Sequence, residues 1–136
     1  MMPKILLDTD ILSLLLRKQP IVISRALQYL SIHPKYTFSL ITRYEVLRGL
    51  KAKNAVKQLA AFDLFCQNSE ILPITEGVIS HASDIYASLH QRGQLIGDAD
   101  LLIAATAINH DLTLATNNEN HFCRVFNLRV DNWSKL

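Results

Sequence analysis

Three acidic side chains stand where the sequence could place a reactive centre: Asp8, Glu45 and Asp100. Asp8 directly follows the apolar run Ile5-Leu6-Leu7, and Asp100 is followed by apolar and alanine residues. Carboxylate oxygens without histidine or cysteine partners favour hard cations such as Mg²⁺ or Mn²⁺. Such a cation, set against a phosphate, activates bound water and stabilises the charge that develops on phosphorus. We therefore predict a Mg²⁺ site, at which Mn²⁺ could also bind. The reaction predicted at this site is the hydrolysis of phosphodiesters.

Asp8 and Asp100 each lie two residues from another acid, Asp10 or Asp98, whose presence helix capping can explain. Asp10 can cap the helix that follows Asp8, because its carboxylate can accept from first-turn N–H groups. Asp98 is equally well placed as a cap, so Asp100, two residues later, is not needed for that role. A carboxylate at the start of a buried helix needs a cation or several donors, since unpaired burial is costly. We predict Asp10 and Asp98 as caps or supporting residues and Asp8 and Asp100 as metal ligands, although Asp8 taken alone also fits a turn or cap.

Glu45 is the only acid between residues 11 and 60, a stretch in which every other charged side chain is basic. Its spacing from Thr42 also fits a capping box, which is a purely local role. Arg43, Arg48 and Lys51 flank it in the sequence and are candidate contacts for phosphates. Residues 61–136 carry the opposite excess, in favour of acids. A basic half beside a carboxylate-bearing half suits a polyanionic substrate; solvated helix faces would give the same pattern.

Polar residues also follow the last core strand, at Thr116-Asn117-Asn118. We predict Asn118 as a fourth and weaker site residue, because its amide offers a neutral oxygen, and Thr116 as a substrate contact. The roles of Asn118, Glu119 and His121 stay open. The histidines show no metal-ligand spacing, so we expect all of them at the surface or at helix ends: His33, His81, His90, His110 and His121.

The elements that must position these residues follow from the hydrophobic pattern. Short apolar or β-branched runs alternate with longer segments of helical period, which indicates an α/β domain with a parallel sheet. In such sheets, ligands bind beyond the carboxyl ends of the strands, where Asp8 and Thr116 lie. Strands are predicted at residues 4–7, 36–40, 70–73 and 112–115, with an edge strand at 128–130. Helices are predicted after Asp8 and Pro20, and over 42–51, 54–67, 75–91 and 98–109.

Length, composition and cysteine content predict the number of domains and the localisation of the protein. A chain of 136 residues, 49 % of them hydrophobic, can bury one core without disulfides or metals, so we predict a single domain over residues 1–136. Cys66 and Cys123 are too few for a disulfide framework, and we expect both as reduced core thiols. The apolar run at residues 5–16 is interrupted by two acids and is too short to span a bilayer. These features predict a cytoplasmic protein without membrane contact.

Four blocks of sequence together resemble the PIN-domain family and, within it, the VapC-type toxins. They follow the expected order and spacing and cover nearly the whole chain. The blocks are Leu6-Leu7-Asp8-Thr9-Asp10-Ile11-Leu12-Ser13, Thr42-Arg43-Tyr44-Glu45-Val46-Leu47-Arg48-Gly49, Ile96-Gly97-Asp98-Ala99-Asp100-Leu101-Leu102-Ile103-Ala104-Ala105-Thr106-Ala107, and Leu114-Ala115-Thr116-Asn117-Asn118 with Phe122 and the tail Asn127-Leu128-Arg129-Val130-Asp131-Asn132-Trp133.

The resemblance implies a three-layer α/β/α fold around a central parallel sheet of four to five strands. It implies a Mg²⁺-dependent endoribonuclease that inhibits translation, a VapB-type antitoxin as partner, a homodimer and a higher hetero-oligomer with the antitoxin. By motif position, Asp8, Glu45 and Asp100 match the family's acidic triad, with Asn118 at a fourth, more variable position. The turn and tail resemble the branch that cleaves initiator tRNA, which suggests tRNA as substrate.

Three positions depart from the family pattern. Asp10 stands where asparagine is commoner, which a capping role tolerates. Asn118 replaces an acid found in many relatives, so one metal or two remains an open question. His121 stands where an acid is frequent.

Three alternatives stay open at this point. Asp8-Thr9-Asp10 also resembles the first motif of haloacid-dehalogenase-type phosphatases, with Asp8 as nucleophile. Those enzymes need a lysine ahead of their last acidic motif, whereas no lysine occurs between Lys57 and Lys135. A PIN nuclease acting on ribosomal RNA or structured nucleic acid is the second alternative. A non-catalytic RNA-binding module is the third, and the presence of all three acids disfavours it.

Overall fold

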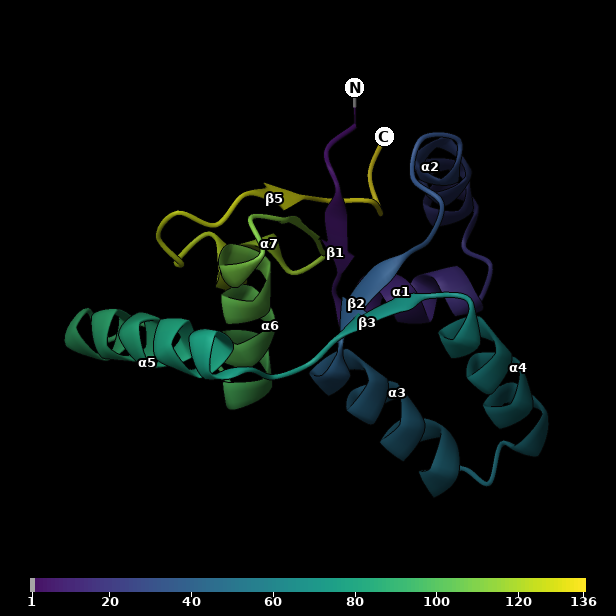
Figure 1. The fold of residues 1–136 in the computed structure, drawn as a ribbon, viewed down its shortest axis with the longest axis horizontal. Helices are drawn as coiled ribbons and strands as arrows, with labels where there is room; N and C mark the ends of the chain where they lie inside the picture. The colour runs from purple at the N-terminus through teal and green to yellow at the C-terminus, as the bar shows by residue number, and fades with distance from the viewer. Residues whose placement is uncertain (1) are drawn as a thin grey trace.

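The computed structural model describes residues 2–136, in which a parallel sheet carries helices on both faces (Figure 1). The strands are β1 (Ile5–Leu7), β2 (Thr37–Ser39), β3 (Glu70–Leu72), β4 (Thr113–Ala115) and β5 (Val130–Asp131). The helices are α1 (Thr9–Leu16), α2 (Pro20–Leu30), α3 (Leu40–Ala52), α4 (Val56–Gln67), α5 (Glu76–Gln91), α6 (Asp98–Asn109) and α7 (Glu119–Phe122). The strand order is β3-β2-β1-β4-β5, and all neighbouring pairs are parallel.

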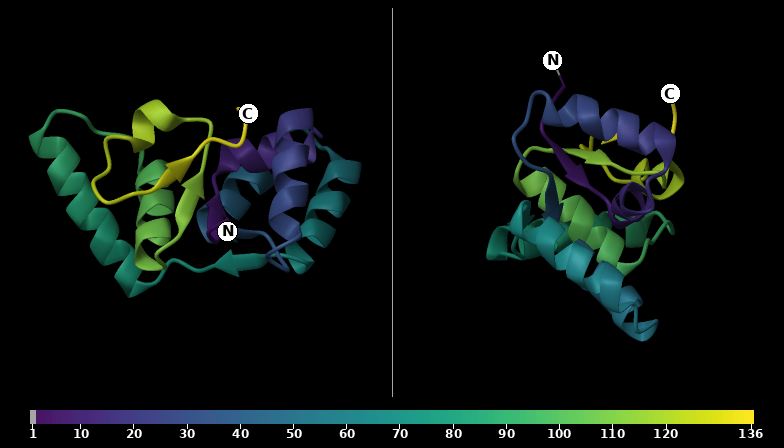
Figure 2. Two further views of the ribbon diagram at one scale, coloured as in Figure 1. Left: turned by 90° about the horizontal axis from the view of Figure 1, so that it is seen from above. Right: turned by 90° about the vertical axis from the view of Figure 1, so that its right-hand side faces the viewer.

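The side chains of β1 alternate between two hydrophobic cores, one on each face of the sheet. Ile5 and Leu7 pack into a core formed with α1, α2 and α4, whereas Leu6 packs into a core formed with α5 and α6. Figure 2 shows the same division, with α5 at one end of the molecule and α2 and α4 at the other. The predicted three-layer α/β/α architecture with four to five parallel strands is therefore confirmed.

The C-terminal tail completes the first of these cores. Trp133 is fully buried, and its ring centroid lies 5.6 Å from that of Tyr29 on α2. Arg25, also on α2, donates to Asp131 Oδ1 and to the carbonyl of Asn132, both at 3.0 Å. The tail is thus held against α2.

Helix α6 forms the centre of the second core. Its buried residues are mostly small or β-branched, which lets the helix pack closely against α5 and the sheet, as the alanine-rich sequence predicts: Leu101, Ile103, Ala104, Ala105, Thr106 and Ala107. Within residues 2–136, no helix combines the length and apolar character needed to cross a bilayer.

Several predicted local details are corrected by the structure. Helix α3 begins at Leu40, because Ser39 takes the N-cap position and its Oγ accepts from the Thr42 N–H at 3.1 Å. The predicted capping box of Thr42 and Glu45 is therefore wrong, and Glu45 is free of that local role. Cys66 is buried as expected, but Cys123 is exposed, so it is not a core thiol.

Candidate active site

The carboxyl ends of β1 and β4 meet at one edge of the sheet and bring Asp8 beside Thr116. The two strands pair in register up to Leu7 and Ala115, so the residues that follow lie side by side. The Thr116 hydroxyl donates to Asp8 Oδ2 at 2.7 Å. Thr116 is fully buried, so its hydroxyl orients Asp8 and is not open to a substrate. This corrects the predicted substrate contact at Thr116.

Asp8 is an almost buried carboxylate in negatively charged surroundings. The residue is 4 % exposed, and burial, followed by the negative charge of Asp10 and a smaller contribution from Asp100, raises the pKa of its carboxyl group to about 8. Hydrogen bonds from Thr116 and from the Thr9 N–H, at 2.8 Å, act in the opposite direction. None of the ion pairs within residues 2–136 involves Asp8 or Asp10. The ionised form of Asp8 is thus disfavoured in the metal-free protein, and a bound cation would stabilise it.

Asp10 connects α1 to the turn that follows β4. One of its oxygens accepts from the next backbone N–H at 2.7 Å, and the other accepts from the Asn117 N–H at 3.0 Å. The N-cap position of α1 belongs to Asp8 and not to Asp10, although Asp10 does accept from an N–H of the first turn, as predicted. Burial raises the pKa of the Asp10 carboxyl group, and nearby Asp100 adds to that rise. Asp10 therefore fixes the turn that carries Asn118 and adds charge to the cluster.

Asp100 reaches the same region from the first turn of α6. Gly97 occupies the N-cap position, and no side chain caps this helix. Asp98 is exposed at the first helical position, which corrects its predicted capping role. The Asp100 side chain is 27 % exposed, and its Oδ2 lies 3.4 Å from Nδ1 of His121 on α7. The same His121 nitrogen lies 2.8 Å from Asn118 Nδ2, so Asp100, His121 and Asn118 form one polar group.

Helix α7 falls where the sequence pattern predicts only a loop, so the group around Asp100 is not visible in the sequence. His121 lies at a helix end, as expected, yet it also contacts a predicted site residue. A four-residue helix is too short to produce a periodic pattern. The departure of His121 from the family's usual acid is the one sequence signal that points to this position.

Glu45 approaches the site from α3 and is connected to it through Thr9. The Thr9 hydroxyl donates to Glu45 Oε1 at 2.6 Å, and Thr9 directly follows Asp8 in the chain. Arg48 Nη2 lies 3.6 Å from Glu45 Oε2, and the Arg48 guanidinium lies 5.2 Å from the centre of the exposed Tyr44 ring. The structure thus adds Thr9 as a residue that positions Glu45.

The predicted basic contacts of α3 point in different directions. Arg43 donates to Cys66 Sγ on α4 at 3.1 Å, so it faces a neighbouring helix and not the acidic cluster. This corrects the predicted phosphate contact at Arg43. The Arg48 side chain is 58 % exposed beside Glu45, and Lys51 is exposed in the last turn of α3. These two remain predicted phosphate contacts.

The C-terminal tail also holds the turn beside the site. Asn132 Nδ2 and Lys135 Nζ donate to Glu119 Oε2 at 3.0 and 2.9 Å, and Ser134 donates to Asn117 Oδ1 at 2.6 Å. The hydrogen bonds from Asn132 and Lys135 lower the pKa of the Glu119 carboxyl group. Glu119, whose role the sequence leaves open, is therefore an anchor for the tail.

The sequence model of the PIN domain matches residues 5–127 of this chain, a range that contains Asp8, Glu45 and Asp100. The chain belongs to the PIN-domain family. Ribonuclease VapC2 of Rickettsia felis is 32 % identical to this PIN domain over 131 residues, which are 96 % of this chain and 98 % of the relative. The tRNA(fMet)-specific endonuclease VapC of Shigella flexneri is 28 % identical over 134 residues, 98 % of this chain and 100 % of that relative.

A solved structure agrees with this assignment. The crystal structure of VapBC2 from Rickettsia felis, bound to a DNA fragment from their promoter, matches this PIN domain with a TM-score of 0.85. The sequences are 30 % identical, and the match covers 94 % of this chain and 97 % of that one. The resemblance to VapC-type PIN domains is confirmed, and the haloacid-dehalogenase-type alternative does not hold.

The donor set of this PIN domain fits a divalent cation. Asp8 and Asp10 have carboxyl pKa values raised by burial and by neighbouring acids, a charge arrangement that a bound cation relieves. Within residues 2–136, no three His, Cys, Asp or Glu side chains are arranged to hold one ion directly. Mg²⁺ keeps several waters of its own, so contacts partly through water suit this set of oxygen donors.

Thr116→Val is expected to lower RNA cleavage about 10- to 100-fold, because it removes the donor that orients Asp8. Thr113→Val is the matched control, since Thr113 is also buried on β4 but only accepts from Arg129 Nε at 3.4 Å, away from the acids. Cleavage rates and the Mg²⁺ concentration at half-maximal rate should both change for Thr116→Val alone. Equal effects of the two substitutions would show that Thr116 has no specific role in the site.

Proposed function

We propose that this VapC-type PIN domain is a Mg²⁺-dependent endoribonuclease and the toxin of a toxin–antitoxin pair. The observation that carries the proposal is the buried Asp8 carboxylate, surrounded by Asp10 and Asp100 at the carboxyl edge of a parallel sheet. When bound, the metal supplies an activated water and stabilises charge on the scissile phosphate. Asp8 and Asp100, with Glu45, are the residues that would hold it.

The remaining polar residues hold these acids in place or contact the substrate. Thr116 orients Asp8, and Thr9 orients Glu45 through the hydrogen bonds described above. Asn118 adds a neutral amide beside Asp100. On α3, the exposed Arg48 is well placed for the phosphate backbone, which supplies affinity without reading sequence.

The substrate and partners of this chain are proposed from its relatives. We propose tRNA as the RNA cleaved, with initiator tRNA as the first candidate, because the Shigella flexneri relative is named as a tRNA(fMet)-specific endonuclease. Cleavage of that RNA would inhibit translation. We also propose a VapB-type antitoxin as partner, because the Rickettsia felis structure is a VapBC complex. The form that binds it is proposed to be a homodimer of this chain.

The experiment is cleavage of RNA by the purified protein with and without Mg²⁺. The protein is expected to cut total tRNA at defined positions in Mg²⁺ or Mn²⁺, and to be inactive in EDTA or after addition of the antitoxin. A DNA oligonucleotide is the control, and we expect it to remain uncut. Cleavage that persists in EDTA would contradict the proposed chemistry.

Mapping of RNA 5′ ends after induction in cells then identifies the substrate. Cuts confined to one or a few tRNAs support the proposed target. Cuts confined to ribosomal RNA would favour the alternative, a PIN nuclease acting on ribosomal RNA.

A further inference from the structure

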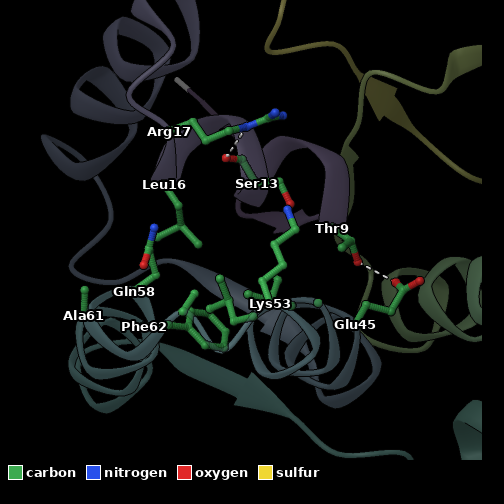
Figure 3. A pocket seen from close by; sticks show the side chains of 13 residues that line it. Thr9, Ser13, Leu16, Arg17, Glu45, Lys53, Gln58, Ala61 and Phe62 are labelled. Carbon is green, nitrogen blue, oxygen red and sulfur yellow. Dashed lines mark hydrogen bonds between the residues drawn. The ribbon is translucent and has the colours of Figure 1, made fainter.

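A pocket of about 450 Å³ lies between α1, α3 and α4 and opens next to the candidate active site (Figure 3). Thr9 and Glu45, which are joined by the 2.6 Å hydrogen bond, form part of its lining. The pocket therefore adjoins Glu45, one of the residues proposed to hold the metal. The mechanism proposed above assigns no role to the remainder of this space.

Two rows of side chains lead along the pocket away from Thr9 and Glu45. Along α1, Ser13 and then Arg17, the C-cap residue, follow Thr9 at intervals of four residues. Along α3, Gly49 and then Lys53, again the C-cap residue, follow Glu45 at the same interval. Residues four apart lie on the same face of a helix, so each row faces the pocket. Eight residues of helix span about 12 Å, so Arg17 and Lys53 lie at the opposite end from the catalytic acid.

The lining combines three kinds of surface. Leu16, Val46 and Phe62 give apolar walls, and Ser13 and Gln58 give hydrogen-bonding groups. Arg17 and Lys53 are exposed, and neither forms an ion pair with an acid within residues 2–136. In Figure 3 the Lys53 side chain extends from the end of α3 toward α1. An occupant with an apolar body, polar edges and an adjacent negative charge matches this combination.

We propose that the pocket receives one unpaired base of the RNA substrate, next to the scissile phosphate, and that Arg17 and Lys53 contact a neighbouring phosphate. This inference rests on the proposed nuclease function and adds a site that selects the sequence to be cut. Proteins read single-stranded RNA by burying splayed-out bases and bonding their edges, while basic side chains hold the backbone. Glu45 belongs both to the pocket and to the candidate active site, and Arg17 and Lys53 form no ion pairs within residues 2–136. Both features favour an RNA base over an apolar protein segment.

Gly49 allows the pocket to be filled without disturbing the fold. It lies within α3, and a Cβ added there would meet no atom within 4 Å. Gly49→Leu therefore places a side chain in the pocket, and Gly49→Ala is the matched control that leaves most of the space open. Both changes remove a residue that destabilises helix interiors, so the Tm of both variants is expected to stay equal or rise.

The test compares the wild type with the two variants on a short RNA and on the same RNA lacking one base beside the cleavage site. For the intact RNA, Gly49→Leu is expected to lower kcat/KM about tenfold or more, mainly through KM, and Gly49→Ala is expected to lower it much less. For the abasic RNA, the wild type is expected to fall to the level of Gly49→Leu. Equal cleavage of intact RNA by wild type and Gly49→Leu, or a deficit that persists on abasic RNA, would overturn the proposal.

Binding measured in EDTA separates this inference from the nuclease function. Fluorescence anisotropy of the labelled RNA is expected to show weaker binding to Gly49→Leu than to Gly49→Ala, and a loss of that difference for abasic RNA. If the wild type cleaves no RNA but shows this binding pattern, the nuclease function fails and the base pocket stands. If Gly49→Leu weakens only the binding of a partner protein, the pocket is a protein-docking site and the proposal is wrong.

Discussion

Asp8→Asn is expected to reduce RNA cleavage roughly a thousandfold while leaving the fold intact. The substitution keeps the shape of the buried side chain and one of the two oxygens that accept from Thr116 and from the Thr9 N–H. It removes the charge that would hold the cation. Glu45→Gln and Asp100→Asn are expected to act in the same direction. Single-turnover cleavage of an RNA oligonucleotide at saturating Mg²⁺ measures the effect.

Asp98→Asn is the matched control for this series. Asp98 lies two residues before Asp100 on the same helix, but it is exposed and caps nothing. We expect its cleavage rate to stay near that of the wild type, with circular dichroism spectra unchanged for all variants. Wild-type rates for purified Asp100→Asn would show that the metal site is assigned to the wrong residues.

The stability of the metal-free protein is expected to fall as the pH rises from about 4 to about 8. Burial and the neighbouring acids raise the pKa of Asp8 to about 8 in the folded chain, from the ordinary aspartate value of 3.8. Between these values the folded state keeps a proton that the unfolded state has lost. Each pH unit in that window therefore lowers the free energy of unfolding by up to about 1.4 kcal/mol.

Urea unfolding in EDTA at pH 5, 6.5 and 8 measures this dependence. Asp8→Asn cannot ionise, so its stability is expected to vary less with pH and to exceed that of the wild type at pH 8. Added Mg²⁺ is expected to stabilise the wild type at pH 8 and to have a much smaller effect on the variant, because a ligand that binds the folded state stabilises it. A flat pH profile for the wild type would show that Asp8 is ionised throughout.

Both predictions depend on the same physical conflict within the site. The sheet brings Asp8 and Asp10 together with Asp100 because α1 and α6 both begin near its carboxyl edge. Buried like charges cost stability, and proteins keep such arrangements where function requires them. A site of this kind is more stable with its cation than without it.

The alternation of short apolar runs and helical segments determined the fold class. Burial on both faces of a parallel sheet requires continuous apolar strands such as Ile5–Leu7 and amphipathic crossovers, and both are readable from local sequence. The placement of Asp8 at a strand end and of Asp100 at a helix start was readable for the same reason. Which predicted elements pack side by side was not readable, because strand order is a property of the whole chain.

Only the tertiary structure decided how the polar residues pair. Thr116 supports Asp8 because β4 adds directly beside β1, although the two residues are 108 positions apart. Ser39 replaces Thr42 as a cap because strand β2 ends at Ser39 and α3 begins at the next residue, Leu40. Either hydroxyl satisfies the local preference for an N-cap. The sequence by itself thus determined the elements and the acids, whereas long-range pairing of strands and helices decided which neighbours hold those acids and where a pocket opens beside them.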